Sequence, residues 1–140
     1  MQYIDNFSYT KIINSFFCIF GILMNIEQLY LYCKSLPQAE ECFPFDEETL
    51  VFKVFGKMFA LLDMEKGDRI NLKCEPLKAE ELREKYSSVL PGYHMNKKHW
   101  NTILLTGELK DEFILSLVKD SYYLVVTSLP KKFQFLCEKN

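Results

Sequence analysis

The chain has 140 residues, of which 49% are hydrophobic and 26% are charged. This size and composition exclude a large multidomain enzyme and a disordered chain, and they fit one folded domain. The 17 basic and 19 acidic residues leave a net charge of −2. Because proteins that neutralise many phosphates usually carry surplus basic residues, this balance argues against a protein that binds DNA with high affinity and without sequence specificity.

Residues 1–23 differ in composition from the rest of the chain. Residues 12–23 are mostly apolar, but such a run is too short to span a bilayer. The segment also lacks the positive start and the small-residue cleavage site of a secretory signal. We therefore expect residues 1–23 to be an extra leader before a native start at Met24, with a start at Met1 or a secretory signal as the alternatives. The domain then covers residues 24–132, and residues 133–140 form a short tail.

The first predicted element after Met24 is an amphipathic helix. Asn25 and Gln28 have the spacing of a capping box, and apolar residues recur at helical spacing until Pro37. Residues 40–48 contain five acidic residues and no basic one. We interpret them as a solvated loop in which Phe43 and Phe45 turn inward.

Three strands are expected next. Residues 50–55 and 57–62 are strand-like on either side of Gly56, which predicts a hairpin. Residues 69–74 alternate between polar and apolar side chains, which is typical of a strand with one solvent-facing side. These three segments predict an antiparallel sheet with one covered face.

The second half of the chain predicts a helix, two strands and a helix. Pro76 suits the first position of a short, solvated helix that reaches Tyr86. A Pro–Gly turn at residues 91–92 precedes a strand that begins at Trp100. Residues 110–129 have helical periodicity, with residues 120–121 as a candidate break and an end before Pro130. The order predicts one α+β domain with helices on one face of an antiparallel sheet.

The patterns that support catalysis or metal binding are missing from the sequence. It has no phosphate-binding glycine loop and no GxSxG turn. His94 and His99 are five residues apart, which does not fit a helical zinc pair, and the five cysteines form no CxxC motif. We expect no enzymatic activity, no metal and no cofactor, and we expect free thiols in a cytoplasmic protein.

The densest group of polar and aromatic residues covers residues 93–101. It holds both histidines, two lysines and the single tryptophan, a mixture that suits a turn touching phosphates beside a stacking ring. The alternative is an ordinary solvated turn at Lys97 and Lys98, with Tyr93 and Trp100 packed in the core.

Basic charge is concentrated in the last third of the chain. Residues 1–90 contain 10 basic and 14 acidic residues, whereas residues 91–140 contain 7 and 5. Lys97 and Lys98 form one dilysine pair there, and Lys131 and Lys132 form another, just after the last predicted helix, where cations complement the helix dipole.

Several segments resemble the MmcQ/YjbR family over residues 24–132. The resemblance is carried by LP at 36–37, FPFD at 43–46, TLVFKV at 49–54, GKMFA at 56–60, NLKC at 71–74, PGYHMNKKHWNT at 91–102, SYxLVV at 121–126 and LPKK at 129–132. It implies a two-layer α-β(3)-α-β(2)-α fold, related to frataxin-like and secretion-chaperone-like sheets.

The resemblance also implies a function, because members of this family are usually described as DNA-binding. The contacts it suggests are Asn96, Lys97, Lys98, His99 and Trp100, and the charge distribution adds Lys131 and Lys132. We therefore expect a small bacterial cytoplasmic protein that binds the DNA backbone weakly and does not insert into a membrane. The alternative is a domain that docks a protein or peptide partner, in the manner of a secretion chaperone.

Overall fold

The computed structural model describes residues 24–138, so the expected leader and its start site lie outside the described residues. The elements are α2 (Ile26–Ser35), β1 (Ala39–Cys42), β2 (Thr49–Val54), β3 (Lys57–Asp63), β4 (Arg69–Lys73), α3 (Pro76–Lys85), β5 (Val89–Pro91), β6 (Trp100–Leu104), α4 (Asp111–Thr127) and α5 (Lys131–Glu138).

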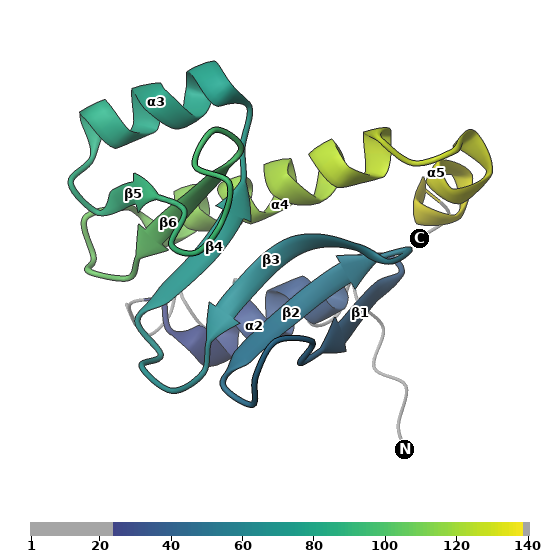
Figure 1. The fold of residues 1–140 in the computed structure, drawn as a ribbon, viewed down its shortest axis with the longest axis horizontal. Coiled ribbons are helices and arrows are strands. Elements are labelled where there is room, and N and C mark those ends of the chain that lie inside the picture. The colour runs from purple at the N-terminus through teal and green to yellow at the C-terminus, as the bar shows by residue number, and fades with distance from the viewer. Residues whose placement is uncertain (1–23, 139–140) are drawn as a thin grey trace.

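The described strands form one open antiparallel sheet with the order β1-β2-β3-β4-β6-β5 (Figure 1). Consecutive strands pair except where β6 lies between β4 and β5. The strand alternation expected at residues 69–74 is present, since Ile70 and Leu72 are buried between less buried neighbours. The expected α+β fold with an antiparallel sheet is confirmed.

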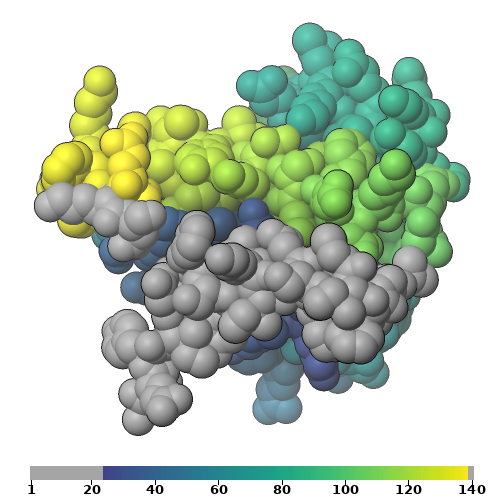
Figure 2. Space-filling model, turned by 180° about the vertical axis from the view of Figure 1, so that it is seen from behind, coloured from purple at the N-terminus to yellow at the C-terminus, as the bar shows by residue number. Residues whose placement is uncertain are grey.

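Helices cover one face of this sheet. α4 packs on β3 and β4 and α2 packs beside it, while α3 lies against β5 and β6 (Figure 1). Figure 2 shows the molecule from behind, with α4 and α3 at its surface. The core between the two layers contains Phe52, Phe59 and Tyr122, and the Phe59 and Tyr122 rings meet edge to face at 5.3 Å. The predicted capping box is present, because the Asn25 side chain accepts a hydrogen bond from the Gln28 backbone N–H. Among residues 24–138, every helix is too short or too polar to cross a membrane.

The segment expected to be an acidic loop contains a strand. β1 occupies one edge of the sheet and pairs with β2 alone. An edge strand needs backbone partners on one side only, so the exposed Glu40 and Glu41 do not prevent it from forming. The expectation that Phe43 and Phe45 turn inward is wrong, since they are 51% and 62% exposed.

The last predicted helix ends before Pro130 as expected, but it has no break at its middle, and a further helix follows it. α4 continues through residues 120–121, because the buried Ser121 hydroxyl donates to the Phe59 carbonyl and accepts from the Lys73 N–H. After Pro130 a further helix, α5, includes most of the expected tail. Its Phe133 ring stacks on Phe55 in the β2–β3 turn at 4.5 Å, and this contact holds α5 against the sheet.

Candidate nucleic-acid interface

The loop between β5 and β6, residues 92–99, is braced at its base. The Gly92 N–H donates to the Trp100 carbonyl at 2.9 Å, and the Tyr93 N–H donates to the Thr102 hydroxyl at 3.0 Å. Thr102 is held in turn by the Asn71 side chain on β4. The loop is therefore anchored to β6 directly and to β4 through side chains.

Gly92 is required at its position by a close approach to Trp100. A Cβ at residue 92 would lie 2.7 Å from the Trp100 Cβ and 3.0 Å from its carbonyl oxygen. Because backbone and Cβ atoms cannot move aside as a flexible side-chain end can, any larger residue would push the loop away from β6. The Pro–Gly pair thus fixes the path of the loop as it leaves β5.

Asn96 shapes the tip of the loop. Its Oδ1 accepts from the Lys98 N–H at 2.9 Å, and its carbonyl accepts from the N–H groups of His99 and Trp100 at 3.2 and 3.0 Å. Such an Asx turn is a common means of closing a tight bend. The carbonyl of His99 accepts from the Cys74 N–H at 2.8 Å, which ties the far side of the loop to the end of β4. Asn96 and His99 therefore position the loop.

Trp100 supports the loop from beneath. Its ring is 7% exposed and packs with Val51 and Leu61 on the sheet face opposite the helices, where Met95 also contacts this cluster. The indole is thus unavailable for stacking against a base. The ring that is exposed belongs to Tyr93, at 60%, and it lies 4.0 Å from the His94 ring.

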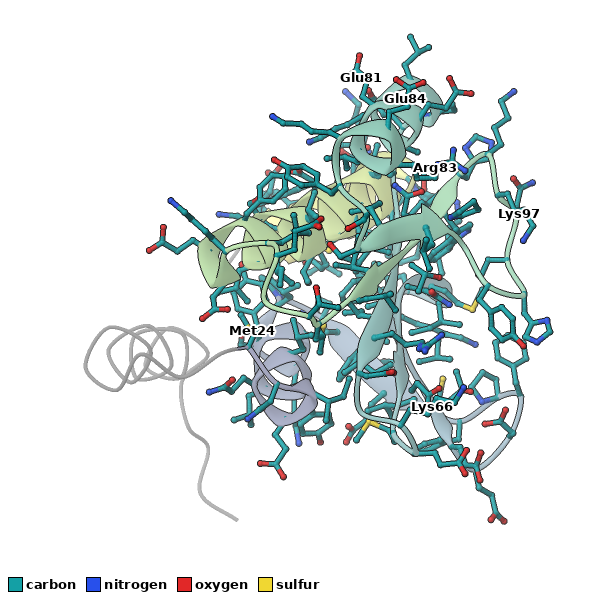
Figure 3. The ribbon with its side chains drawn as sticks, turned by 90° about the vertical axis from the view of Figure 1, so that its left-hand side faces the viewer. Met24, Lys66, Glu81, Arg83, Glu84 and Lys97 are labelled. Atoms are coloured by element: carbon teal, nitrogen blue, oxygen red, sulfur yellow. The ribbon has the colours of Figure 1, made fainter. Side chains whose placement is uncertain are left out.

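Lys97 and Lys98 are exposed on the loop, and Lys97 lies on the side away from α2 and α4 (Figure 3). Lys97 Nζ lies 3.4 Å from the Gly92 carbonyl. Lys73 is directly opposite Trp100 in the β4–β6 register, so strand alternation places it on the same sheet face. These three lysines form no ion pair with any residue that the structure describes. We call Lys73, Tyr93, His94, Lys97 and Lys98 the loop surface.

Other basic residues on this sheet face have acidic neighbours. The Arg69 guanidinium contacts the Asp68 carboxylate at 2.9 Å. This ion pair lowers the pKa of Asp68, and the carboxylate balances the positive charge of the arginine. Lys53 lies opposite Glu40 in the β1–β2 register. On this sheet face, Lys73, Lys97 and Lys98 differ from Arg69 and Lys53, because they have neither an ion pair nor an acidic cross-strand neighbour among residues 24–138.

Lys131 and Lys132 lie elsewhere. They occupy the first turn of α5, at the end of the molecule opposite the β5–β6 edge (Figure 1). The Lys132 ammonium lies 5.0 Å from the Phe133 ring. The expectation that these lysines complement the end of the last helix is wrong, because they begin another helix, whose N-terminal dipole disfavours cations. The structure does not bring the two dilysine pairs together.

Sequence reasoning did not single out Lys73. The alternating pattern of residues 69–74 places its side chain on the solvent-facing side of the strand. Its proximity to Lys97 and Lys98 depends on the pairing of β4 with β6, which skips β5. Such a crossover is not visible in a local pattern, so only the assembled sheet reveals this neighbour.

The fold and the site define a class of protein: a two-layer α+β domain with one sheet face covered by helices and a braced, basic loop on the other. The chain belongs to the YjbR family, whose sequence profile matches residues 34–124. The family expected from the sequence is therefore confirmed.

Two relatives illustrate the similarity in sequence. The chain is 38% identical over 110 residues to the uncharacterized protein YjbR of Escherichia coli K12, covering 78% of this chain and 93% of the relative. It is 43% identical over 100 residues to the uncharacterized protein YbdF of Escherichia coli O157:H7, covering 71% and 82%. Because both are named as uncharacterized, they assign no activity.

Solved structures agree with the architecture. The crystal structure of protein DR2400 of Deinococcus radiodurans superposes with a TM-score of 0.75 at 40% identity, covering 82% of this chain and 88% of that one. A Pseudomonas syringae protein gives a TM-score of 0.62 at 32% identity, covering 73% and 99%. The similarity establishes the family and the fold.

Proposed function

We propose that this protein binds DNA weakly and without sequence preference, with Lys73, Lys97 and Lys98 contacting the phosphate backbone. The observation that carries the proposal is a braced loop that presents two exposed lysines beside a third, with no acidic partner among the described residues. Backbone contacts of this kind position a protein on DNA without reading its sequence.

The Tyr93 and His94 rings add a second type of contact. They are exposed next to the lysines, and exposed rings beside cations can stack on an unpaired or frayed base. The net charge of −2 keeps the expected affinity low, with a Kd of about 10⁻⁴ M at physiological salt. The proposed role is binding without catalysis.

A salt titration tests this function. Fluorescence anisotropy of a labelled duplex is measured between low and physiological salt. Three lysine contacts predict a slope of log K against log salt of roughly −2 to −3, because each phosphate contact releases close to one counterion. Absence of binding at low salt, or binding that salt does not weaken, contradicts the proposal.

A cytoplasmic location is part of the same proposal. The four cysteines among the described residues, Cys33, Cys42, Cys74 and Cys137, are free thiols. Free thiols persist in reducing compartments, whereas secreted domains of this size often pair them. Fractionation of cells that express the full chain tests the location, and recovery of the protein outside the cytoplasm contradicts it.

A docked protein partner is the second candidate function. β1 pairs on one side only, and Phe43 and Phe45 are exposed immediately after it. An extended peptide could add a strand at this edge and place apolar side chains against the two rings. This function is supported if a protein still co-purifies with the chain after nuclease treatment, but does not co-purify with a Phe43→Ser, Phe45→Ser variant. A partner retained by that variant contradicts it.

A further inference from the structure

The backbone of Tyr93 is held on both sides while its ring stays in solvent. Its N–H donates to the Thr102 hydroxyl on β6 at 3.0 Å, and its carbonyl accepts from the Asn71 Nδ2 on β4 at 3.4 Å. The residue is nevertheless more than half exposed. Two neighbouring strands therefore fix the point from which the ring projects, although most of the side chain is outside the core.

The turn that carries this ring has an unfavourable backbone conformation. The Met95 N–H donates to the Gly92 carbonyl at 3.2 Å, so Tyr93 and His94 are the two central residues of a four-residue turn. His94 has a φ of 58°, in the left-handed region that such turns usually fill with glycine. Conformations of this kind occur often at ligand-binding sites, where the surrounding structure holds them in place.

The histidine places a second exposed ring beside Tyr93. The two ring centroids are 4.0 Å apart, and the ring planes are tilted by 51° to one another. Because of this tilt, the rings do not form a parallel stack with each other. Both residues are exposed, so a flat ring of a ligand has access to them.

Lysine side chains lie next to these rings. The Lys97 Nζ is 3.4 Å from the Gly92 carbonyl, one residue before Tyr93, and Lys98 is exposed on the same loop. Neither lysine forms an ion pair with any of residues 24–138. A ligand that suits both kinds of group carries negative charges and flat rings along one chain, which is the chemistry of a nucleic-acid strand.

The rings and the lysines favour different forms of DNA. In a duplex each base is already stacked between its neighbours, whereas in a single strand a base face is open to an aromatic side chain, and stacking on it adds affinity. Lysine contacts favour the duplex, because it has the higher charge density and releases more counterions per contact. A preference for the single strand would therefore come from the rings and not from the lysines.

We propose that the loop surface binds single-stranded DNA in preference to duplex DNA, with the Tyr93 ring stacking on an unpaired base while Lys97 and Lys98 contact phosphates of the same strand. This inference rests on the proposed function and adds the form of DNA that the site selects. Tyr93 determines the preference, and the lysines supply the binding that both forms of DNA share.

Three labelled ligands of equal length test this preference: an oligothymidine strand, a strand of abasic sites and a duplex. The abasic strand keeps the phosphates and lacks the bases, so it isolates the contribution of stacking. At low salt, fluorescence anisotropy should show that the full chain binds oligothymidine at least about fivefold more tightly than either other ligand, because stacking on a single base contributes at least about that factor. An affinity for oligothymidine that is no higher than the affinity for either other ligand overturns the proposal.

Three variants assign the preference to one ring. Tyr93→Leu keeps an apolar side chain and removes the ring, so its affinities for oligothymidine and the abasic strand should agree within about twofold. Tyr93→Phe keeps the ring and should retain the preference. Tyr123→Leu is the matched control, because Tyr123 on α4 is also exposed and has the Lys119 Nζ 5.9 Å from its ring, but lies on the helix side of the sheet. A preference that survives Tyr93→Leu, or that is lost in Tyr123→Leu, overturns the proposal.

The duplex separates a failure of this inference from a failure of the proposed function. If the duplex binds in a salt-dependent manner but oligothymidine binds no more tightly, the stacking contact is wrong and the lysine contact stands. If none of the three ligands binds at low salt, both are wrong.

Discussion

The two dilysine pairs are the same in sequence and differ in their surroundings. Lys97 and Lys98 lie on an irregular loop, which is held by a hydrogen bond donated by the Gly92 N–H and by hydrogen bonds that Asn96 accepts. Lys131 and Lys132 lie in the first turn of α5, where the helix dipole already supplies positive potential. The role of a basic pair therefore depends on the backbone that presents it, and we place the proposed DNA contact at Lys97 and Lys98.

The largest expected effect is a loss of DNA affinity when the charge of the first dilysine pair is reversed, with the second pair as the control. Lys97→Glu with Lys98→Glu should lower the affinity for duplex DNA by about tenfold or more at low salt, because two phosphate contacts are lost and repulsion is added. The matched control, Lys131→Glu with Lys132→Glu, changes the net charge equally and should weaken binding by less than about threefold. Equal losses in the two variants, measured by anisotropy, would remove the distinction between the pairs.

A second test displaces the loop that carries Lys97 and Lys98 without changing the charge of either lysine. Gly92→Ala places a Cβ 2.7 Å from the Trp100 Cβ, so it should cost about 1–3 kcal/mol of stability and displace the loop. Urea denaturation measures the free energy of unfolding, and anisotropy measures the accompanying loss of DNA binding. A variant with wild-type stability would show that the loop does not need this close contact.

A smaller effect, on the free energy of unfolding, is expected at the second dilysine pair. Glutamates in the first turn of a helix interact favourably with its dipole, so Lys131→Glu with Lys132→Glu should stabilise the protein by about 0.3–1 kcal/mol. The same replacements at residues 97–98 lie outside any helix and should give no comparable gain. Urea denaturation of both variants checks this, and a loss of stability in the α5 variant would be the opposite result.

The smallest expected effect concerns the edge of the sheet that carries the basic loop. The Glu108 carboxylate accepts hydrogen bonds from Ser87 and Ser88, just before β5, and these lower its pKa from 4.5. A lowered pKa stabilises the fold above pH 4.5, and this contribution is lost as the pH falls through the folded-state value. Glu108→Gln should therefore be less stable than the wild type at pH 7, and the difference should shrink at about pH 3. A difference in urea midpoint that is constant with pH would argue against this role.

Much of the fold could be predicted because strong local patterns determine it. The capping box at Asn25, the hairpin around Gly56 and the alternation at residues 69–74 each involve neighbours in sequence. The order of the elements predicted helices on one face of an antiparallel sheet, and the family resemblance implied the same architecture. β1 was not predicted, because a strand with exposed glutamates is tolerated only at the edge of the sheet. α5 was not predicted, because the contact that holds it joins Phe133 to Phe55, which is distant in the sequence.

The sequence points to a candidate site at residues 93–101, but it does not reveal what each of these residues does. Composition identified residues 93–101, and the structure shows Lys97 and Lys98 exposed there. Asn96 and Trp100 brace the loop, because hydrogen bonds at its tip and the cluster beneath it engage them. The place of Lys73 beside this loop could not be predicted, because it depends on the pairing of β4 with β6. These roles depend on contacts between distant segments, which local sequence patterns do not encode.

The most direct test of the proposed DNA contact is an NMR titration of the full chain with a short duplex at low salt. We expect saturable shifts at residues 92–100 and at Lys73, together with no comparable shifts at Lys131 and Lys132. Shifts centred on α5, or no shifts at the β5–β6 loop, would contradict it.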